Sequence, residues 1–164
     1  MSTPTALVDY FQVQLYSPKV FEAFRRTRLL VPLGDIAEII TVQQRDLCPL
    51  PGLPRGVTGV LNLRGQLIWT MDLRLLNESW AGSARRNLQA KLTLVLVASE
   101  QGQIACLVDR LLGIMNCHLE QCQPARSPFS SAYAFCENEL ALENGDTGLL
   151  LDTPQLFKHL RYGP

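Results

Sequence analysis

The stretch GVLNLRGQLIWTMDLR, from Gly59 to Arg74, sets an arginine and two glycines in an otherwise apolar run that is typical of a buried strand. Arginine stays protonated in proteins, and isolating its guanidinium in an apolar site costs a prohibitive amount of free energy. Arg64 must therefore either face solvent or meet a carboxylate.

Glu38 is a second charge that interrupts a strand-like apolar run, since Ile36, Ile39 and Ile40 flank it. Two opposite charges placed in this way can satisfy one another on a shared face, in a bidentate arginine–carboxylate geometry. We predict that Glu38 and Arg64 pair. An exposed pair adds little to stability, so we expect it to shape a recognition surface. The alternative is two unrelated charges that face solvent.

The composition is that of one globular domain. The chain has 164 residues, of which 47% are hydrophobic and 18% charged, so it can bury a sizeable core. Fifteen basic residues balance fifteen acidic ones without any block of like charge, which argues against nucleic acid as a partner. The N-terminus lacks a secretory signal, and no apolar stretch reaches the roughly 18 residues of a membrane helix. We expect a cytoplasmic protein with no membrane insertion.

The five cysteines are odd in number and irregularly spaced, which predicts reduced thiols rather than a disulfide framework. Cys117, His118 and Cys122 lie close together in sequence, but the spacing of a four-ligand zinc site is missing. We therefore expect no metal and no cofactor.

Alternating apolar and polar residues make strands the most common element that the sequence predicts. Residues 11–15 read as a half-buried strand, and 28–42 as two strands joined by a turn. The apolar runs 92–99 and 104–115 flank a polar turn with a glycine, which predicts a hairpin.

Two helices are expected. A serine–proline pair at 17–18 suits the start of a short N-terminal helical insertion over about 18–27. Near the other end of the chain, Asp152 or Thr153 is a suitable N-cap for a C-terminal helix over 152–160.

Many short strands separated by turns are typical of an antiparallel barrel or a pair of barrels. A polar break near 78–90 suggests two similar halves. We expect one mainly β domain over 1–164, with 28–76 mainly in a first barrel and 91–151 mainly in a second.

Residues suited to catalysis are scattered. Neither of the two histidines, His118 and His159, lies near a serine or cysteine motif of the nucleophilic kind. Phosphate-binding glycine loops are missing. Asp72, Asp109 and Asp152 follow apolar strands, where an aspartate commonly closes a strand or caps a helix. We predict that the chain is not an enzyme.

Four motifs occur in a particular order: IAEI at 36–39, LPGLP at 50–54, the long block at 59–74, and LVDRLLGI at 107–114. In this order they resemble the CheW-like chemotaxis coupling-protein family, and the resemblance covers about residues 29–160. It implies two small five-stranded β-barrels packed around a hydrophobic core, and a non-catalytic adaptor.

Proteins of this family bridge methyl-accepting chemoreceptors to a chemotaxis-type histidine kinase. The resemblance implies that the kinase binds at barrel ends and the receptor tip in a groove between the barrels. By position, it places Ile36 and Glu38 on the receptor-facing surface, Arg64 beside Glu38, and Ala105 and Leu107 on the other wall of the groove.

The chain also departs from the family pattern. Trp69 and Thr70 stand where family members carry Pro-Val, and we expect Trp69 in the core or the barrel wall. Flagellar, pilus-type and other chemosensory systems all stay open. A small-molecule-binding β-barrel is the alternative function, and it would need an apolar cavity of about a few hundred Å³.

Overall fold

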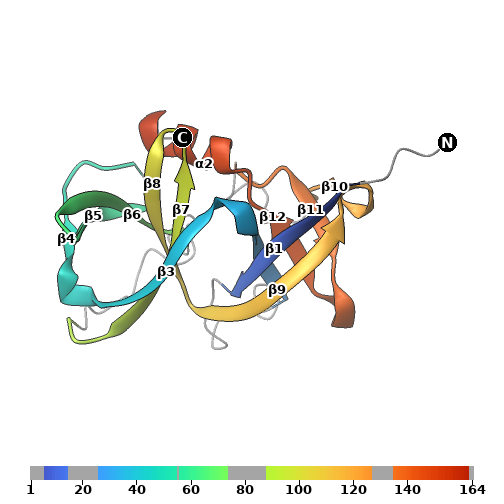
Figure 1. The fold of residues 1–164 in the computed structure, drawn as a ribbon, viewed down its shortest axis with the longest axis horizontal. Coiled ribbons are helices and arrows are strands. Elements are labelled where there is room, and N and C mark those ends of the chain that lie inside the picture. Colours follow the sequence, from blue (N-terminus) through green and yellow to red (C-terminus); the bar gives the residue numbers. More distant parts are fainter. Residues whose placement is uncertain (1–5, 15–25, 55, 74–87, 127–134, 163–164) are drawn as a thin grey trace.

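The computed structural model describes residues 6–14, 26–54, 56–73, 88–126 and 135–162. Within these ranges the chain forms two six-stranded sheets and one α-helix, so the mainly β prediction is confirmed (Figure 1). None of the described helices is long and apolar enough to span a membrane.

In Figure 1 the first sheet lies on the right and the second on the left, with the helix above them. In spatial order the first sheet contains β10 (Gln123–Pro124), β11 (Asn138–Ala141), β12 (Thr147–Leu150), β2 (Thr27–Pro32), β1 (Leu7–Gln14) and β9 (Arg110–His118). The second contains β3 (Ile36–Gln43), β7 (Lys91–Ser99), β8 (Gly102–Val108), β6 (Gln66–Asp72), β5 (Val57–Leu63) and β4 (Leu47–Pro49). The helix, α2, spans Thr153–Tyr162, and short 3-10 helices cover Leu33–Asp35, Gln44–Asp46, Leu119–Gln121 and Glu143–Gly145.

The sheets differ from the expected pair of five-stranded barrels. Each has six strands, one of which is only two or three residues long, and each keeps two edge strands in its hydrogen-bonding order. The short strand β4 lies against β5 at Gly59, where an added Cβ would overlap the carbonyl oxygen of Cys48. A glycine is therefore required for this sixth strand to pair.

Most strands of the range 28–76 belong to the second sheet, and most strands of 91–151 belong to the first. The exceptions are β2, which joins the first sheet, and β7 and β8, which join the second. The predicted helical insertion at 18–27 lies largely outside the described residues, and the part that is described includes the start of β2 at Thr27.

The main core lies between the sheets and α2, and the middle of β7 is buried on both faces. Along β7, Val95 and Val97 pack into this core, while Leu94 and Leu96 pack into a second cluster inside the curl of the second sheet. A strand covered on both sides is expected to be continuously apolar, which explains the run LTLVLVA.

The run 104–115, predicted as one arm of a hairpin, contains two strands. The hairpin of β7 and β8 is confirmed, but the chain leaves the second sheet at Asp109, whose backbone N–H donates to the carbonyl of Gln14 in β1. β9 then pairs with β1 in the first sheet. One continuous stretch of chain therefore links the two sheets.

The C-terminal helix is confirmed, with the expected cap. The Asp152 carboxylate accepts a hydrogen bond from the backbone N–H of Gln155 at 3.1 Å, which satisfies one of the free donors of the first turn. Leu156 and Phe157 are buried in the main core, so the helix covers the junction of the two sheets.

Candidate functional site

Arg64 lies in a turn, not within a strand as its apolar surroundings suggested. It forms with Gly65 the two-residue connection between β5 and β6, and both residues have positive φ values, 53° and 84°. Two positive φ values in a two-residue hairpin define a type I′ turn. The side-chain carbonyl of Asn62 accepts a hydrogen bond from the backbone N–H of Gly65 at 2.9 Å.

Glu38 lies near the start of β3, just after a β-bulge. The register with β7 shifts between Ile36 and Glu38, which leaves one extra residue in β3. Because of this bulge, Ile36 and Ile39 both pack against the main core, although residues three apart in a regular strand point to opposite faces.

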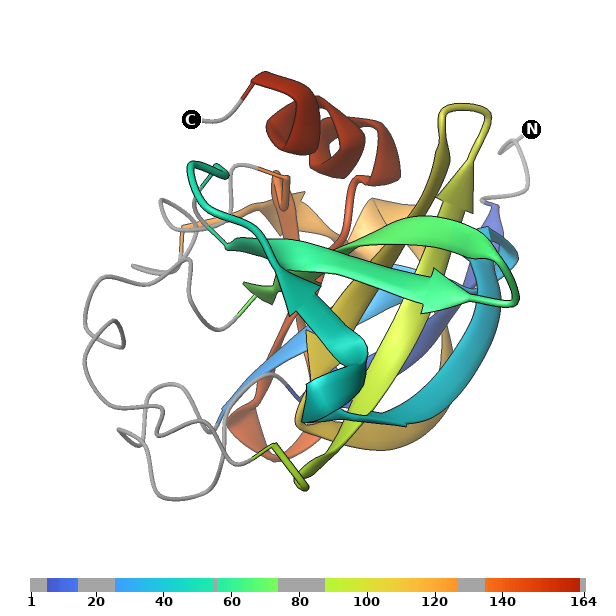
Figure 2. The same ribbon diagram turned by 90° about the vertical axis from the view of Figure 1, so that its left-hand side faces the viewer.

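The predicted pair of Glu38 and Arg64 is confirmed. The two terminal nitrogens of Arg64 donate to the two carboxylate oxygens of Glu38, at 2.6 and 3.0 Å. β3 and β6 are separated by two strands in the sheet order, so the curl of the sheet brings the β5–β6 turn to β3 (Figure 2). The side chains are 71% exposed for Arg64 and 34% for Glu38, so the pair lies at the surface.

Each partner shifts the pKa of the other. The hydrogen bonds from Arg64, helped by its positive charge, hold the pKa of Glu38 below its usual value of 4.5. Hydrogen bonding to Glu38, followed by the attraction of its negative charge, raises the pKa of Arg64. The pair is therefore fully ionised near neutral pH.

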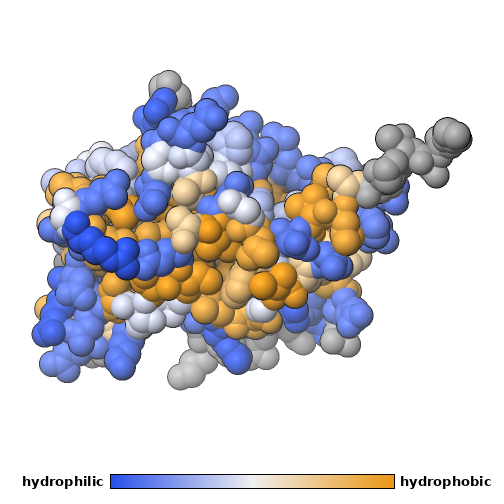
Figure 3. All heavy atoms as spheres, in the orientation of Figure 1, coloured by the Kyte–Doolittle hydropathy of each residue, from blue (hydrophilic) through white to orange (hydrophobic). Residues whose placement is uncertain are grey.

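Exposed apolar side chains accompany the pair. Leu67, three residues after Arg64, is 69% exposed. On β9, Leu111 and Ile114 are 42% and 62% exposed. Figure 3 shows apolar residues gathered across the middle of the face on which β3 and β9 lie in Figure 1, with hydrophilic residues around them. Such a contiguous apolar surface with a polar rim is typical of a protein interaction site.

The five residues expected at the receptor-facing surface lie at different depths. Glu38 and Arg64 are at the surface, and Ile36 is half-buried against the main core. Ala105 and Leu107 are buried, at 0% and 5% exposure, within the cluster inside the second sheet. Side chains buried to this extent offer little surface to a partner, so they can affect binding mainly through the shape of what covers them.

Groups that could carry catalysis or hold a metal do not converge in the described ranges. His118 is exposed, whereas His159 packs edge-on against the ring of Phe135, with a centroid distance of 5.9 Å. No group of three or more His, Cys, Asp or Glu side chains gathers there as a metal site would need. Burial raises the pKa of Cys106 to about 12 and, with the nearby Cys122 as a further cause, that of Cys117 to about 11.

One feature of the surface was missed by sequence reasoning. Trp69 lies in β6 of the second sheet, but it is 39% exposed and its side chain lines a cavity beside α2. The signal was the alternation in β6, where Leu67 and Trp69 face out while Ile68 and Thr70 are buried.

Comparison with known proteins identifies the family of the chain. Residues 20–161 match the model of the CheW-like domain. Similar solved structures include the scaffolding protein TtCheW from Thermoanaerobacter tengcongensis, which is 15% identical over 89% of each chain with a TM-score of 0.65. That likeness concerns the fold, and no curated protein matches the sequence. Because the family model covers most of its length, the chain belongs to the CheW-like domain family.

Proposed function

We propose that this chain is a non-catalytic signalling adaptor that couples chemoreceptors to a chemotaxis-type histidine kinase in the cytoplasm. Membership of the CheW-like family supports an adaptor role. The single observation that carries the proposal is the bidentate pair of Glu38 and Arg64, exposed on a molecule that also presents an apolar face.

The surface around the pair is the proposed receptor contact. Desolvated apolar groups supply most of the free energy of such contacts, and a fixed charge pair at their edge selects the partner and its orientation. In this proposal Ile36, Glu38 and Arg64 belong to the contact. Ala105 and Leu107 support it from below, because they are buried.

The proposed mechanism is positional. The adaptor holds the receptor tip and the kinase in a fixed relative geometry, so a change in the receptor alters the kinase through contacts that differ between its two states. Both sheets contribute to one buried core, which favours a rigid link between separate binding surfaces. The output is motility, by flagella or by pili, or another chemosensory response.

A pull-down with the tagged chain from its own cells tests the proposal. We expect a chemotaxis-type histidine kinase and a methyl-accepting receptor to be retained together. Glu38→Arg should lose the receptor and keep the kinase, because the charge pair is proposed for the receptor contact alone. Glu137→Arg is the matched control, since Glu137 is an exposed carboxylate elsewhere on the surface. Retention of neither partner by the unaltered chain would contradict the adaptor function.

A further inference from the structure

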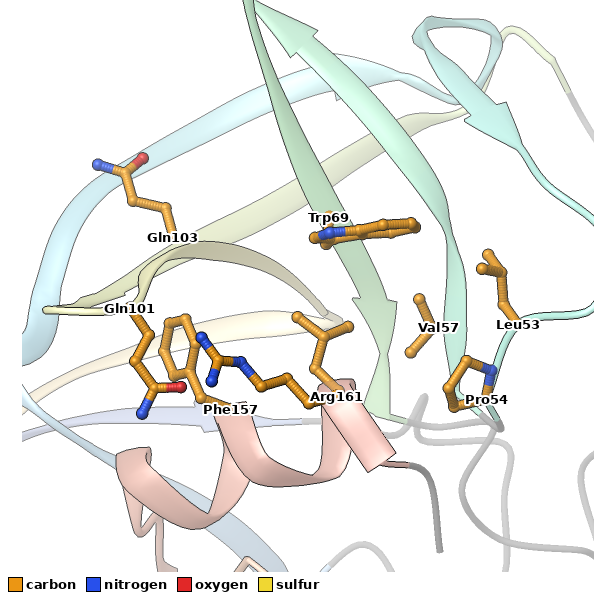
Figure 4. A pocket seen from close by; sticks show the side chains of 9 residues that line it. Leu53, Pro54, Val57, Trp69, Gln101, Gln103, Phe157 and Arg161 are labelled. Atoms are coloured by element: carbon orange, nitrogen blue, oxygen red, sulfur yellow. The ribbon is translucent and has the colours of Figure 1, made fainter.

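A cavity of about 360 Å³ lies between β6, the β7–β8 turn and α2 (Figure 4). Its apolar lining includes Trp69 from β6, Val57 from β5, Leu53 from the preceding loop, and Phe157 from α2. Figure 4 shows the indole of Trp69 beside the open space, between the side of α2 and the side of Val57 and Leu53. The size is within the range of small-molecule sites, which is about 300–1,000 Å³.

Three polar side chains line the same cavity: Gln101 and Gln103 from the β7–β8 hairpin, and Arg161 from the last turn of α2. Within the described ranges, the structure gives none of these side chains a hydrogen bond or an ion pair. The cavity therefore combines an aromatic wall with a positive charge and two amides that have no partner there.

A second cavity, of about 400 Å³, makes a useful contrast. Its cation is Arg28, but that guanidinium already donates to the carboxylate of Asp146 and to the side chain of Gln12. Binding an anion there would require breaking a partly buried ion pair. The cavity at Trp69 has no such cost.

We propose that the cavity at Trp69 binds a small aromatic carboxylate. The ring packs against the indole of Trp69 and the apolar lining, as aromatic pairs do at centroid distances of about 4.5–7 Å. The carboxylate accepts two parallel hydrogen bonds from Arg161, and a glutamine amide can donate a further one. The end of α2 carries about half a negative charge from the helix dipole, which the full charge of Arg161 outweighs.

The assignment does not rest on the adaptor function. Neither Glu38 nor Arg64 lines the cavity. A ligand seated there would contact α2, β6 and the β7–β8 turn together, so it would stabilise the folded state by mass action. The two proposals can therefore fail separately.

The test uses phenylacetate as the probe, with 2-phenylethanol as its uncharged counterpart and acetate as the carboxylate without a ring. Because the chain has two tryptophans, a Trp80→Phe background leaves Trp69 as the only tryptophan that emits. We expect a saturable change in Trp69 fluorescence with phenylacetate, a millimolar or tighter Kd, and a raised melting temperature. Acetate alone should produce neither effect.

Arg161→Gln should weaken phenylacetate binding by about tenfold or more while leaving the weaker binding of 2-phenylethanol unchanged, because only the anion uses the guanidinium fork. Arg161→Lys should give an intermediate affinity. Arg45→Gln is the control, since Arg45 is an exposed arginine outside the lining. The proposal is overturned if phenylacetate fails to saturate the folded protein, or if the affinities of phenylacetate and 2-phenylethanol fall equally in Arg161→Gln.

Discussion

Two arginine–carboxylate pairs, one in each sheet, use the same chemistry in different settings. In the first sheet, Arg28 donates to Asp146 at 2.7 Å and to Gln12 at 2.9 Å, with side chains that are 30% exposed for Arg28 and 16% for Asp146. In the second sheet, Arg64 meets Glu38 with both nitrogens, but its side chain is 71% exposed.

The difference in exposure between the two pairs indicates which of them supports the fold. Arg28, in β2, holds Gln12 of β1 and Asp146, the residue before β12, which is 118 residues away in the sequence. Water screens this pair less than the exposed pair, because both side chains are more buried. Arg64 instead occupies a left-handed turn position that favours glycine or asparagine. A residue in a backbone conformation that it does not favour, in an exposed pair, fits the proposed role in recognition better than a role in stability.

Removing the hydrogen bonds of Arg28 to Asp146 and Gln12 should have the largest effect on stability. Arg28→Met is expected to lower the free energy of unfolding by about 2 kcal/mol, because it removes hydrogen bonds between charged groups and leaves a mostly buried carboxylate without its cation. Urea unfolding measures this. Arg45→Met, at an exposed arginine with no ion pair in the described ranges, should change it by less than about 0.5 kcal/mol. If Arg28→Met and Arg45→Met lower the free energy of unfolding equally, the Arg28–Asp146 pair does not support the fold more than an exposed arginine does.

Thiol labelling should report the same difference more locally. Cys117 is buried in the first sheet beside Tyr10 and Leu30, so it reacts with a thiol reagent only when that sheet opens. Arg28→Met should raise its labelling rate by about tenfold or more, whereas Arg64→Gln should leave it unchanged. Peptide-resolved mass spectrometry separates Cys117 from the exposed Cys48. A similar labelling rate of Cys117 in both variants would show that the Arg28–Asp146 pair does not control the opening of the first sheet.

Replacing Arg64 by asparagine should separate binding from folding. Asn-Gly is the preferred sequence of a type I′ turn, so Arg64→Asn should leave the urea midpoint unchanged or slightly raised. The same variant loses the hydrogen bonds to Glu38 and should weaken receptor binding. A lowered midpoint would mean that the exposed pair supports the fold after all.

The smallest effect concerns the titration of Glu38. Because its pKa is lowered in the folded state, the contribution of the pair is present above the usual value of 4.5 and is lost as the pH falls through the lowered pKa. NMR of the Glu38 side chain should give a midpoint below 4.5, which returns toward 4.5 in Arg64→Gln. If the titration midpoint of Glu38 is the same in Arg64→Gln as in the unaltered chain, the pair does not persist in solution.

Local features of the fold could be predicted from the sequence because they depend on neighbours in the chain. The paired strands around 92–108 and the cap at Asp152 follow from apolar periodicity and from residue preferences at turns and helix ends. The order of the strands could not be predicted. β3 pairs with β7, which lies about fifty residues later in the chain. The alternation of apolar and polar residues predicts that a segment is a strand, but it does not predict which other strand pairs with it.

The candidate site was predictable in its charges but not in its geometry. A charged side chain in an apolar run needs a partner of opposite charge, and this reasoning predicted that Glu38 and Arg64 pair. In the structure the two side chains form an ion pair. The turn at Arg64 was hidden because Arg-Gly is not a usual type I′ sequence. The passage of the chain from the second sheet to the first at Asp109 could not be predicted, because a single aspartate in an apolar run does not indicate that the chain changes sheet.

A charge-swap cycle on receptor binding tests the central claim most directly. Glu38→Arg and Arg64→Glu should each reduce affinity for a receptor-tip fragment, and the double variant, which restores an opposite-charge pair, should recover much of it. Recovery of that kind requires that the two residues act together in the contact. If the two losses simply add in the double variant, the pair does not act as a unit in recognition and the account is contradicted.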